Sequence, residues 1–336
     1  MITSTRRIVW IDWMKTIAMY SIVAGHCGVP GNKYIYVFSV PCFFILSGFL
    51  SKRENDVLLF WKKLFWNLFA PMSIFFLINT MFQFAAQIIN GSFEFKFIYQ
   101  APLLAAIGMH GQNYAAGGLM VMWFVYTLIL CKILLQYIPV NNQKVTLVVI
   151  SCVFLIMAKL LDLKGIVLYN SIVDVLLAMP FFTVGYLIKP YKDILSSISI
   201  KWLPILLIIG IIGVILSGRY NDIVMLYRCS YGSNMILCIV GALCGTVGIY
   251  SISRMLERYL TGFASVMGAG TLVILGFHTI IIMILNRLIA VQGIWLYAES
   301  LLIFVAFYPV IEFTKKHFSV LYGKLRMPND KSRHAH

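Results

Sequence analysis

Three ionisable residues, Asp12, Lys15 and His26, interrupt an otherwise apolar stretch near the N-terminus. At about 100° per helical residue, the step from Lys15 to His26 returns to within about 20° of the same direction, and Asp12 lies within about 60° of both. All three are therefore predicted on one face of one helix. Ionisable groups at membrane depth are costly and usually face a bundle interior or a polar cavity.

His26 has the chemistry of a general base, because a neutral imidazole accepts a proton near physiological pH. Asp12 lies about 21 Å and Lys15 about 16 Å from it along the helix axis, too far to orient it directly. We therefore expect the orienting group on another helix. The alternative is a self-satisfying Asp12–Lys15 pair with His26 at the membrane interface.

The composition indicates which elements must position these residues. Of the 336 residues, 61% are hydrophobic and 12% are charged, whereas a typical soluble domain is about 25% charged. So few charges exclude a water-soluble globule, and apolar runs along the whole chain exclude a single anchor. The sequence predicts an all-α, polytopic integral membrane bundle.

Ten segments are long and apolar enough to cross the hydrocarbon core. The expected spans are 8–26, 34–51, 67–89, 118–138, 144–161, 168–188, 201–217, 234–253, 269–290 and 293–313. The gap at about 90–117 is expected to be an outer loop with a short interfacial helix. We expect residues 1–326 to form one transmembrane domain and residues 327–336 a polar, disordered tail.

The distribution of basic residues predicts the topology. With the N-terminus inside, the inner segments hold 19 of the 27 Lys and Arg residues, among them Lys52, Lys63, Lys132 and Lys189, and the outer segments hold 5. Cytoplasmic loops are enriched in these residues, so we expect both termini inside a cell (inner) membrane.

A second motif lies in the next span, in the run from Val40 to Phe49. Pro41 frees a backbone carbonyl and can kink the helix, and Ser47-Gly48 permits close helix approach or a backbone that lines a cavity. The loop expected to follow is strongly basic, with Lys52, Arg53, Lys62 and Lys63. Tight helix packing and ordinary positive-inside usage explain these features equally well when each is taken alone.

Together, these motifs resemble the membrane-bound acyltransferase 3 family, especially its short polysaccharide O-acetyltransferase branch. The matching elements are Ile11-Asp12-Trp13-Met14-Lys15, Gly25-His26, Val40-Pro41-Cys42-Phe43-Phe44 and Ser47-Gly48-Phe49, with weaker matches at Trp123-Phe124-Val125 and over residues 268–278. One departure is the family's basic RxxR-like pair, whose second basic position is missing after Lys62-Lys63.

The resemblance implies an enzyme that moves an acyl group, usually acetyl, from cytoplasmic acyl-CoA to a hydroxyl of a surface polysaccharide or lipid-linked sugar. Acetyl-CoA is then the donor substrate, with no tightly bound cofactor and no metal. We expect His26 to be the general base, with Asp12 or Ser47 in support or at the oxyanion. The candidates for binding the CoA phosphates are Lys15, Lys52, Arg53, Lys62 and Lys63.

Candidates for binding the acceptor lie in later helices: Trp123, Tyr126, His278 and Arg287. Each has a plainer explanation. The aromatic residues can be membrane-boundary anchors, His278 can be a packed core histidine, and Arg287 can form a structural pair. His110 and Asp174 are weaker candidates of the same kind.

Two other functions fit parts of the pattern. A multi-pass transporter or flippase would use Asp12, Lys15 and His26 as a polar relay, although the sequence shows no inverted repeat. An N-acyltransferase of the same family would use the same motifs on an amine. Nucleic acid is not an expected partner, because the basic excess has the topological explanation given above.

Overall fold

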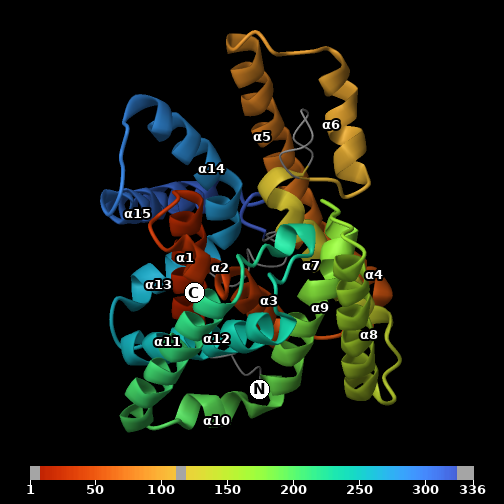
Figure 1. The fold of residues 1–336 in the computed structure, drawn as a ribbon, viewed down its shortest axis with the longest axis vertical. Coiled ribbons are helices and arrows are strands. Elements are labelled where there is room, and N and C mark those ends of the chain that lie inside the picture. The colour runs from red at the N-terminus through yellow and green to blue at the C-terminus, as the bar shows by residue number, and fades with distance from the viewer. Residues whose placement is uncertain (1–7, 111–118, 324–336) are drawn as a thin grey trace, which may run out of the picture.

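The computed structural model describes residues 8–110 and 119–323, and within them the chain is helical with no strand (Figure 1). The helices are α1 Val9–His26, α2 Asn32–Tyr36, α3 Ser39–Leu50, α4 Val57–Leu64, α5 Ala70–Ile89, α6 Lys96–Ala106, α7 Trp123–Tyr137, α8 Gln143–Leu163, α9 Ser171–Ile188, α10 Lys192–Ser197, α11 Leu203–Tyr220, α12 Met235–Leu256, α13 Thr261–Ala269, α14 Thr271–Leu288 and α15 Trp295–His317. A π-helical turn, η1 Phe65–Phe69, joins α4 to α5, and short 3₁₀ turns include η3 Lys189–Tyr191 and η5 Leu226–Arg228.

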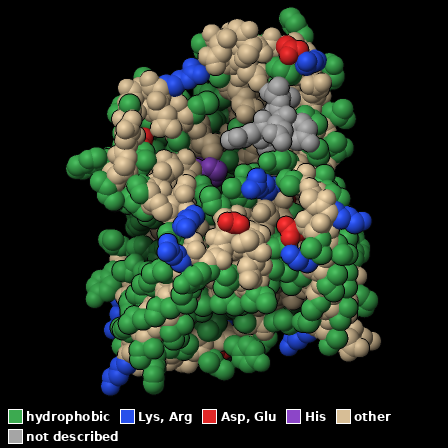
Figure 2. Space-filling model, viewed as in Figure 1, with side chains coloured by type: hydrophobic (Ala, Val, Ile, Leu, Met, Phe, Trp, Pro, Cys, Tyr) green, Lys and Arg blue, Asp and Glu red, His purple; other side chains and the backbone are tan. Residues whose placement is uncertain are grey.

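The expected polytopic bundle is confirmed. Among the described residues, nine helical segments are long and apolar enough to cross a membrane. Nine of the ten expected spans correspond to these segments. The remaining one, 8–26, corresponds to α1, which lacks the hydropathy of the other nine. Helices α8 and α11 leave most of their apolar residues exposed, and hydrophobic side chains cover much of the lower part of the face in Figure 2. Such surfaces fit contact with lipid.

Helix α1 lies inside the bundle. Most of its residues are buried, and α3, α12, α13, α14 and α15 contact it. Asp12 is 7% exposed and Lys15 is half-buried. Asp12 and Lys15 of the predicted polar face are therefore enclosed by protein, as the cost of ionisable groups in lipid requires.

Two glycines allow α3 and α9 to pack at backbone contact. A Cβ atom on Gly185 would lie 1.8 Å from the carbonyl oxygen of Ile45, and a Cβ atom on Gly48 would lie 1.9 Å from that of Phe182. The close approach expected at Gly48 is confirmed. It fixes α3, and hence the basic segment that follows α3, against α9.

Two local expectations were wrong. Lys62 and Lys63 lie on α4 and not in a loop, because the Asp56 side chain accepts hydrogen bonds from two backbone N–H groups of the first turn and caps a helix there. That helix continues into α5, so the third span begins at Val57 and not at residue 67. The kink expected at Pro41 agrees with the structure, because the helical segment is interrupted between α2 and α3 at residues 37–38, where the Pro41 ring cannot donate to the Val37 carbonyl.

The remaining boundaries agree closely with expectation. The segment from residue 90 contains the expected short helix, α6, and a break at Gln292-Gly293 separates α14 from α15, with Gly293 at a φ of +62°. The expected tail at 327–336 lies outside the described residues.

The α3–α9 contact generates a stability prediction. Gly185→Ala places a methyl group inside the backbone of α3, which overpacking data put at about 1–3 kcal/mol of destabilisation. The variant should melt at a lower temperature than wild type in detergent. Gly262→Ala on α13 is the matched control, because a Cβ atom there meets nothing within 4 Å. Equal melting temperatures for Gly185→Ala and Gly262→Ala would contradict the contact.

Candidate active site

His26 is the last residue of α1, and its side chain is exposed although both chain neighbours, Gly25 and Cys27, are buried. The Tyr36 hydroxyl donates a 2.8 Å hydrogen bond to the Gly25 carbonyl and holds α2 against this helix end. Among the described residues, no group forms a hydrogen bond with the His26 ring. The ring is therefore free of hydrogen bonds within the described chain, at a residue that is exposed.

His278 from α14 packs against His26, with ring centroids 4.9 Å apart and planes at 64°. Its Nδ1 lies 3.0 Å from the carbonyl oxygens of both Ile274 and Leu275. Carbonyl oxygens only accept, so Nδ1 carries the proton and donates to them. The Nε2 lone pair is buried and has no hydrogen-bond partner in the described chain. His278 is thus placed to support His26, and its contact with an acceptor stays a prediction.

Cys27 follows His26 in the chain, and Glu299 lies near Cys27. Burial, reinforced by the nearby Glu299 carboxylate, raises the pKa of the Cys27 thiol to about 11, so Cys27 is protonated at neutral pH and unsuited to act as a nucleophile. Glu299, on α15, has one carboxylate oxygen buried without a hydrogen-bond partner in the described chain. Sequence reasoning missed Glu299, because nothing in its spacing links α15 to α1.

A cluster of cations surrounds Ser51 at the end of α3. Lys132 from α7 donates a 2.8 Å hydrogen bond to the Ser51 hydroxyl, and Lys189 from η3 donates one of 2.7 Å to its carbonyl oxygen. Both lysines were counted for topology in the sequence but not identified as site residues, since they are brought to Ser51 only by tertiary packing.

The predicted donor-binding residues join the same cluster. Lys63 and Lys52 approach Glu54 at 2.9 Å and 3.6 Å, and Arg53 donates to the Ile138 carbonyl at 2.7 Å. The hydrogen bond from Lys63 is the main reason that the pKa of Glu54 is lowered. This group contains one carboxylate and five cations, Lys52, Arg53, Lys63, Lys132 and Lys189, so the surface favours anions. Lys62 is exposed beside it on α4.

The cation cluster and His26 lie toward opposite ends of α1. Trp10, at the start of α1, packs on Phe49 of α3 with ring centroids 5.9 Å apart, two residues before Ser51. The 18 residues of α1 span about 26 Å. Asp12 and Lys15 lie on the stretch between the two sites.

Ser47 belongs to the cation end of α3. Its carbonyl oxygen accepts a 2.7 Å hydrogen bond from the Ser51 hydroxyl, and its side chain is half-buried. No contact between Ser47 and His26 is present in the described chain. A role for Ser47 at the oxyanion stays a prediction.

The other acceptor candidates are dispersed. Arg287 is exposed at the end of α14.

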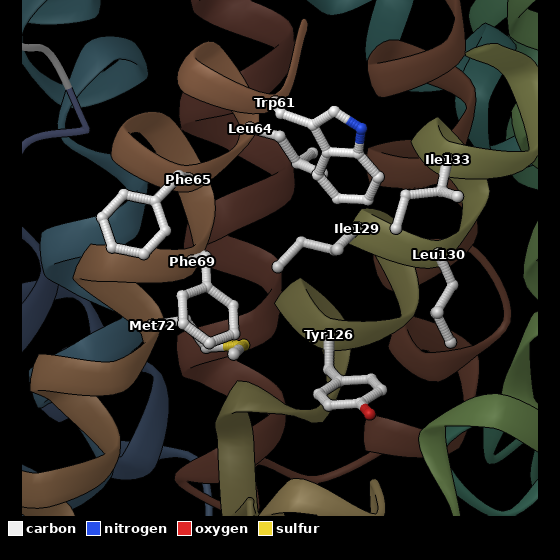
Figure 3. A pocket seen from close by; sticks show the side chains of 9 residues that line it. All are labelled: Trp61, Leu64, Phe65, Phe69, Met72, Tyr126, Ile129, Leu130 and Ile133. Atoms are coloured by element: carbon white, nitrogen blue, oxygen red, sulfur yellow. The ribbon is translucent and has the colours of Figure 1, made fainter. Parts of the chain in front are cut away.

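Tyr126 donates a 3.1 Å hydrogen bond to the Ala106 carbonyl and lines a cavity of about 340 Å³ between α4–α5 and α7 (Figure 3). The cavity is also lined by Trp61, Leu64, Phe65, Phe69, Met72, Ile129, Leu130 and Ile133. Its lining has no charged group and no histidine, so it offers a place for apolar chains but no acid–base chemistry. Trp123 lies with His110, at a ring-centroid distance of 5.8 Å.

Comparison with known proteins places the chain in a family. The acyltransferase 3 family model, described as an acyltransferase domain, matches residues 8–311. No curated protein and no solved structure gives a significant match to the chain. The matched range begins before α1 and ends within α15, so it contains the polar face, the cation cluster and His278.

The difference in exposure between the histidines gives a chemical prediction. Diethyl pyrocarbonate acylates accessible imidazoles, so it should modify His26 in the folded protein, while His110 and His278, at 1% and 0% exposure, stay unmodified until unfolding. Peptide mass spectrometry after brief labelling measures this. Labelling of His278 as fast as His26 would contradict the arrangement, and His317, exposed at the end of α15, is the internal positive control.

Proposed function

The chain belongs to the acyltransferase 3 family, and on that premise we propose that it is a membrane-bound O-acetyltransferase. It moves an acetyl group from cytoplasmic acetyl-CoA to a hydroxyl of a surface polysaccharide or lipid-linked sugar. The observation that carries the proposal is the pairing of an accessible imidazole at one end of α1 with a cation cluster at the other.

The cation cluster supports binding of the donor. The phosphates of CoA are multiply charged anions, which lysine and arginine bind through charge-assisted hydrogen bonds. With the phosphates at Lys52, Arg53, Lys62 and Lys63, the thioester arm extends along α1 past Lys15 toward His26. Lys132 and Lys189 add positive charge while they hold Ser51.

This arrangement supports the proposed topology. Lys52, Lys63, Lys132 and Lys189 were all expected on the cytoplasmic side, and their side chains share the region around Ser51 and Glu54. A cytoplasmic position for this cluster gives both termini inside a cytoplasmic membrane and puts His26 toward the outer face.

The chemical step needs one base. A nitrogen of His26 takes the proton of the acceptor hydroxyl as its oxygen attacks the thioester carbonyl carbon. The tetrahedral intermediate collapses, the carbon–sulfur bond breaks, and the proton passes from the imidazolium to the departing CoA sulfur. The products are an acetyl ester and CoA. Holding both substrates at one imidazole supplies part of the acceleration.

His278 is proposed as a positioning residue. Its ring is fixed by two carbonyl groups and packs on the His26 ring, which limits the orientations that His26 can adopt. This is the neighbour from another helix that the sequence required without identifying. The protonated Cys27 thiol leaves His26 as the group in this position that is suited to accept a proton.

The first test is His26→Ala. Removing a general base typically costs about 10²–10⁴-fold in rate, so transfer of radiolabelled acetyl from acetyl-CoA to the host's surface polysaccharide should fall by that factor while the protein stays folded in the membrane. His317→Ala, which removes an exposed histidine from the end of α15, should transfer normally. Wild-type activity in His26→Ala would refute the base assignment.

A second test addresses the donor end. Lys52 is 67% exposed, so Lys52→Gln removes a charge with little structural cost. Loss of a hydrogen bond to a charged group corresponds to a rise of about tenfold in KM for acetyl-CoA, with kcat nearly unchanged. Lys192→Gln is the matched control, because Lys192 is an exposed lysine on α10. An equal KM in both variants would exclude Lys52 from donor binding.

A further inference from the structure

Four rings from four segments of the chain gather beside α9. His110 follows α6, Trp123 begins α7, Tyr169 precedes α9 and Tyr227 lies in η5. The ring centroid of His110 is 5.8 Å from that of Trp123, 6.5 Å from Tyr169 and 6.4 Å from Tyr227. Tyr227 is also 6.3 Å from Trp123 and 6.0 Å from Tyr169. The rings therefore form one cluster.

The cluster has a buried side and an accessible side. His110 is 1% exposed, whereas Trp123, Tyr169 and Tyr227 are each half-buried. The three aromatic side chains are thus partly exposed and pack on the buried His110 ring. Tyrosine and tryptophan rings offer a flat apolar surface together with a polar group that can form hydrogen bonds.

A buried ionisable pair, His110 and Asp174, holds the His110 ring in place. His110 Nε2 lies 2.7 Å from Asp174 Oδ2, and Asp174, on α9, is 0% exposed. The other carboxylate oxygen of Asp174 accepts a 3.1 Å hydrogen bond from the backbone N–H of Cys229, two residues after Tyr227. One buried carboxylate therefore ties the His110 segment and the Tyr227 segment to α9. Such a pair is strongly destabilised when one partner is removed.

The cluster lies on the His26 side of the bundle. Trp123 begins α7 and Tyr169 precedes α9, whereas Lys132 lies in the second half of α7 and Lys189 follows the end of α9. The rings therefore lie at the ends of α7 and α9 opposite the cation cluster, as His26 lies at the opposite end of α1. No residue of the cation cluster contacts these rings in the described chain.

We propose that Trp123, Tyr169 and Tyr227 form the subsite that holds a sugar ring of the acceptor, an inference that rests on the proposed function. A pyranose has an apolar C–H face, which packs on aromatic rings, and a rim of hydroxyls, which pair with tyrosine hydroxyls and the indole N–H. A ring held there places a neighbouring hydroxyl of the acceptor at His26. The buried His110–Asp174 pair positions the aromatic residues and does not contact the sugar.

The experiment measures binding separately from transfer. The probe is the host's surface polysaccharide, stripped of acetyl esters with mild alkali, and its binding to the full-length protein in nanodiscs is measured without acetyl-CoA. Tyr227→Leu and Trp123→Leu replace a flat ring by a branched side chain and should each raise Kd by about tenfold. Tyr227→Phe, which keeps the ring, should stay within about threefold of wild type.

Two controls make the outcomes distinguishable. Tyr220→Leu removes an exposed tyrosine at the end of α11 and should leave Kd unchanged, while His26→Ala should bind like wild type and transfer at least about 100-fold more slowly. Unchanged binding in Tyr227→Leu and Trp123→Leu, or no binding by wild type, overturns the subsite. Ring-dependent binding without any acetyl transfer by wild type supports the subsite and refutes the proposed function.

Discussion

The structure depends on the cost of placing ionisable side chains on a helix at membrane depth. Asp12, Lys15 and His26 cannot face lipid, so α1 has to be enclosed by other helices. Six helices contact it, and α3 and α12 bring with them the backbone and aromatic groups that pack along it. Because α1 is enclosed, Asp12 and Lys15 face protein along its length. The same constraint explains why α1 lacks the hydropathy of the nine apolar spans.

Close packing then produces two separate sites, one at each end of α1. The backbone contact between Gly48 and Gly185 fixes α3 against α9, and it delivers Ser51 to the lysines of α7 and η3. At the other end, Tyr36 closes on Gly25 and leaves His26 exposed between buried neighbours. A cation cluster and an accessible base at opposite ends of one helix suit a reaction whose donor and acceptor come from different sides of a membrane. Acyl transfer from the cytoplasm to an outer sugar is such a reaction.

Much of this could be predicted from the sequence, since hydropathy fixes spans and helical periodicity fixes which residues share a face. The spans, the face of α1 and the close approach at Gly48 follow from those rules. The helix at Lys62 and Lys63 was not predicted, because it depends on the Asp56 side chain capping its first turn. The grouping of Lys132 and Lys189 with Ser51, of His278 with His26, and of Trp123 with Tyr169 and Tyr227 arises from helices distant in the chain. One sequence contains no signal that pairs such residues, so only the tertiary structure reveals them.

The central claim is that one imidazole serves a donor from one face and an acceptor from the other. Inside-out membrane vesicles test it directly, with deacetylated host polysaccharide sealed in the lumen and radiolabelled acetyl-CoA added outside. The account predicts that label appears as alkali-labile ester on the enclosed polysaccharide, and that His26→Ala abolishes it. Labelling that occurs only when acetyl-CoA and polysaccharide share the same face of the membrane would contradict it.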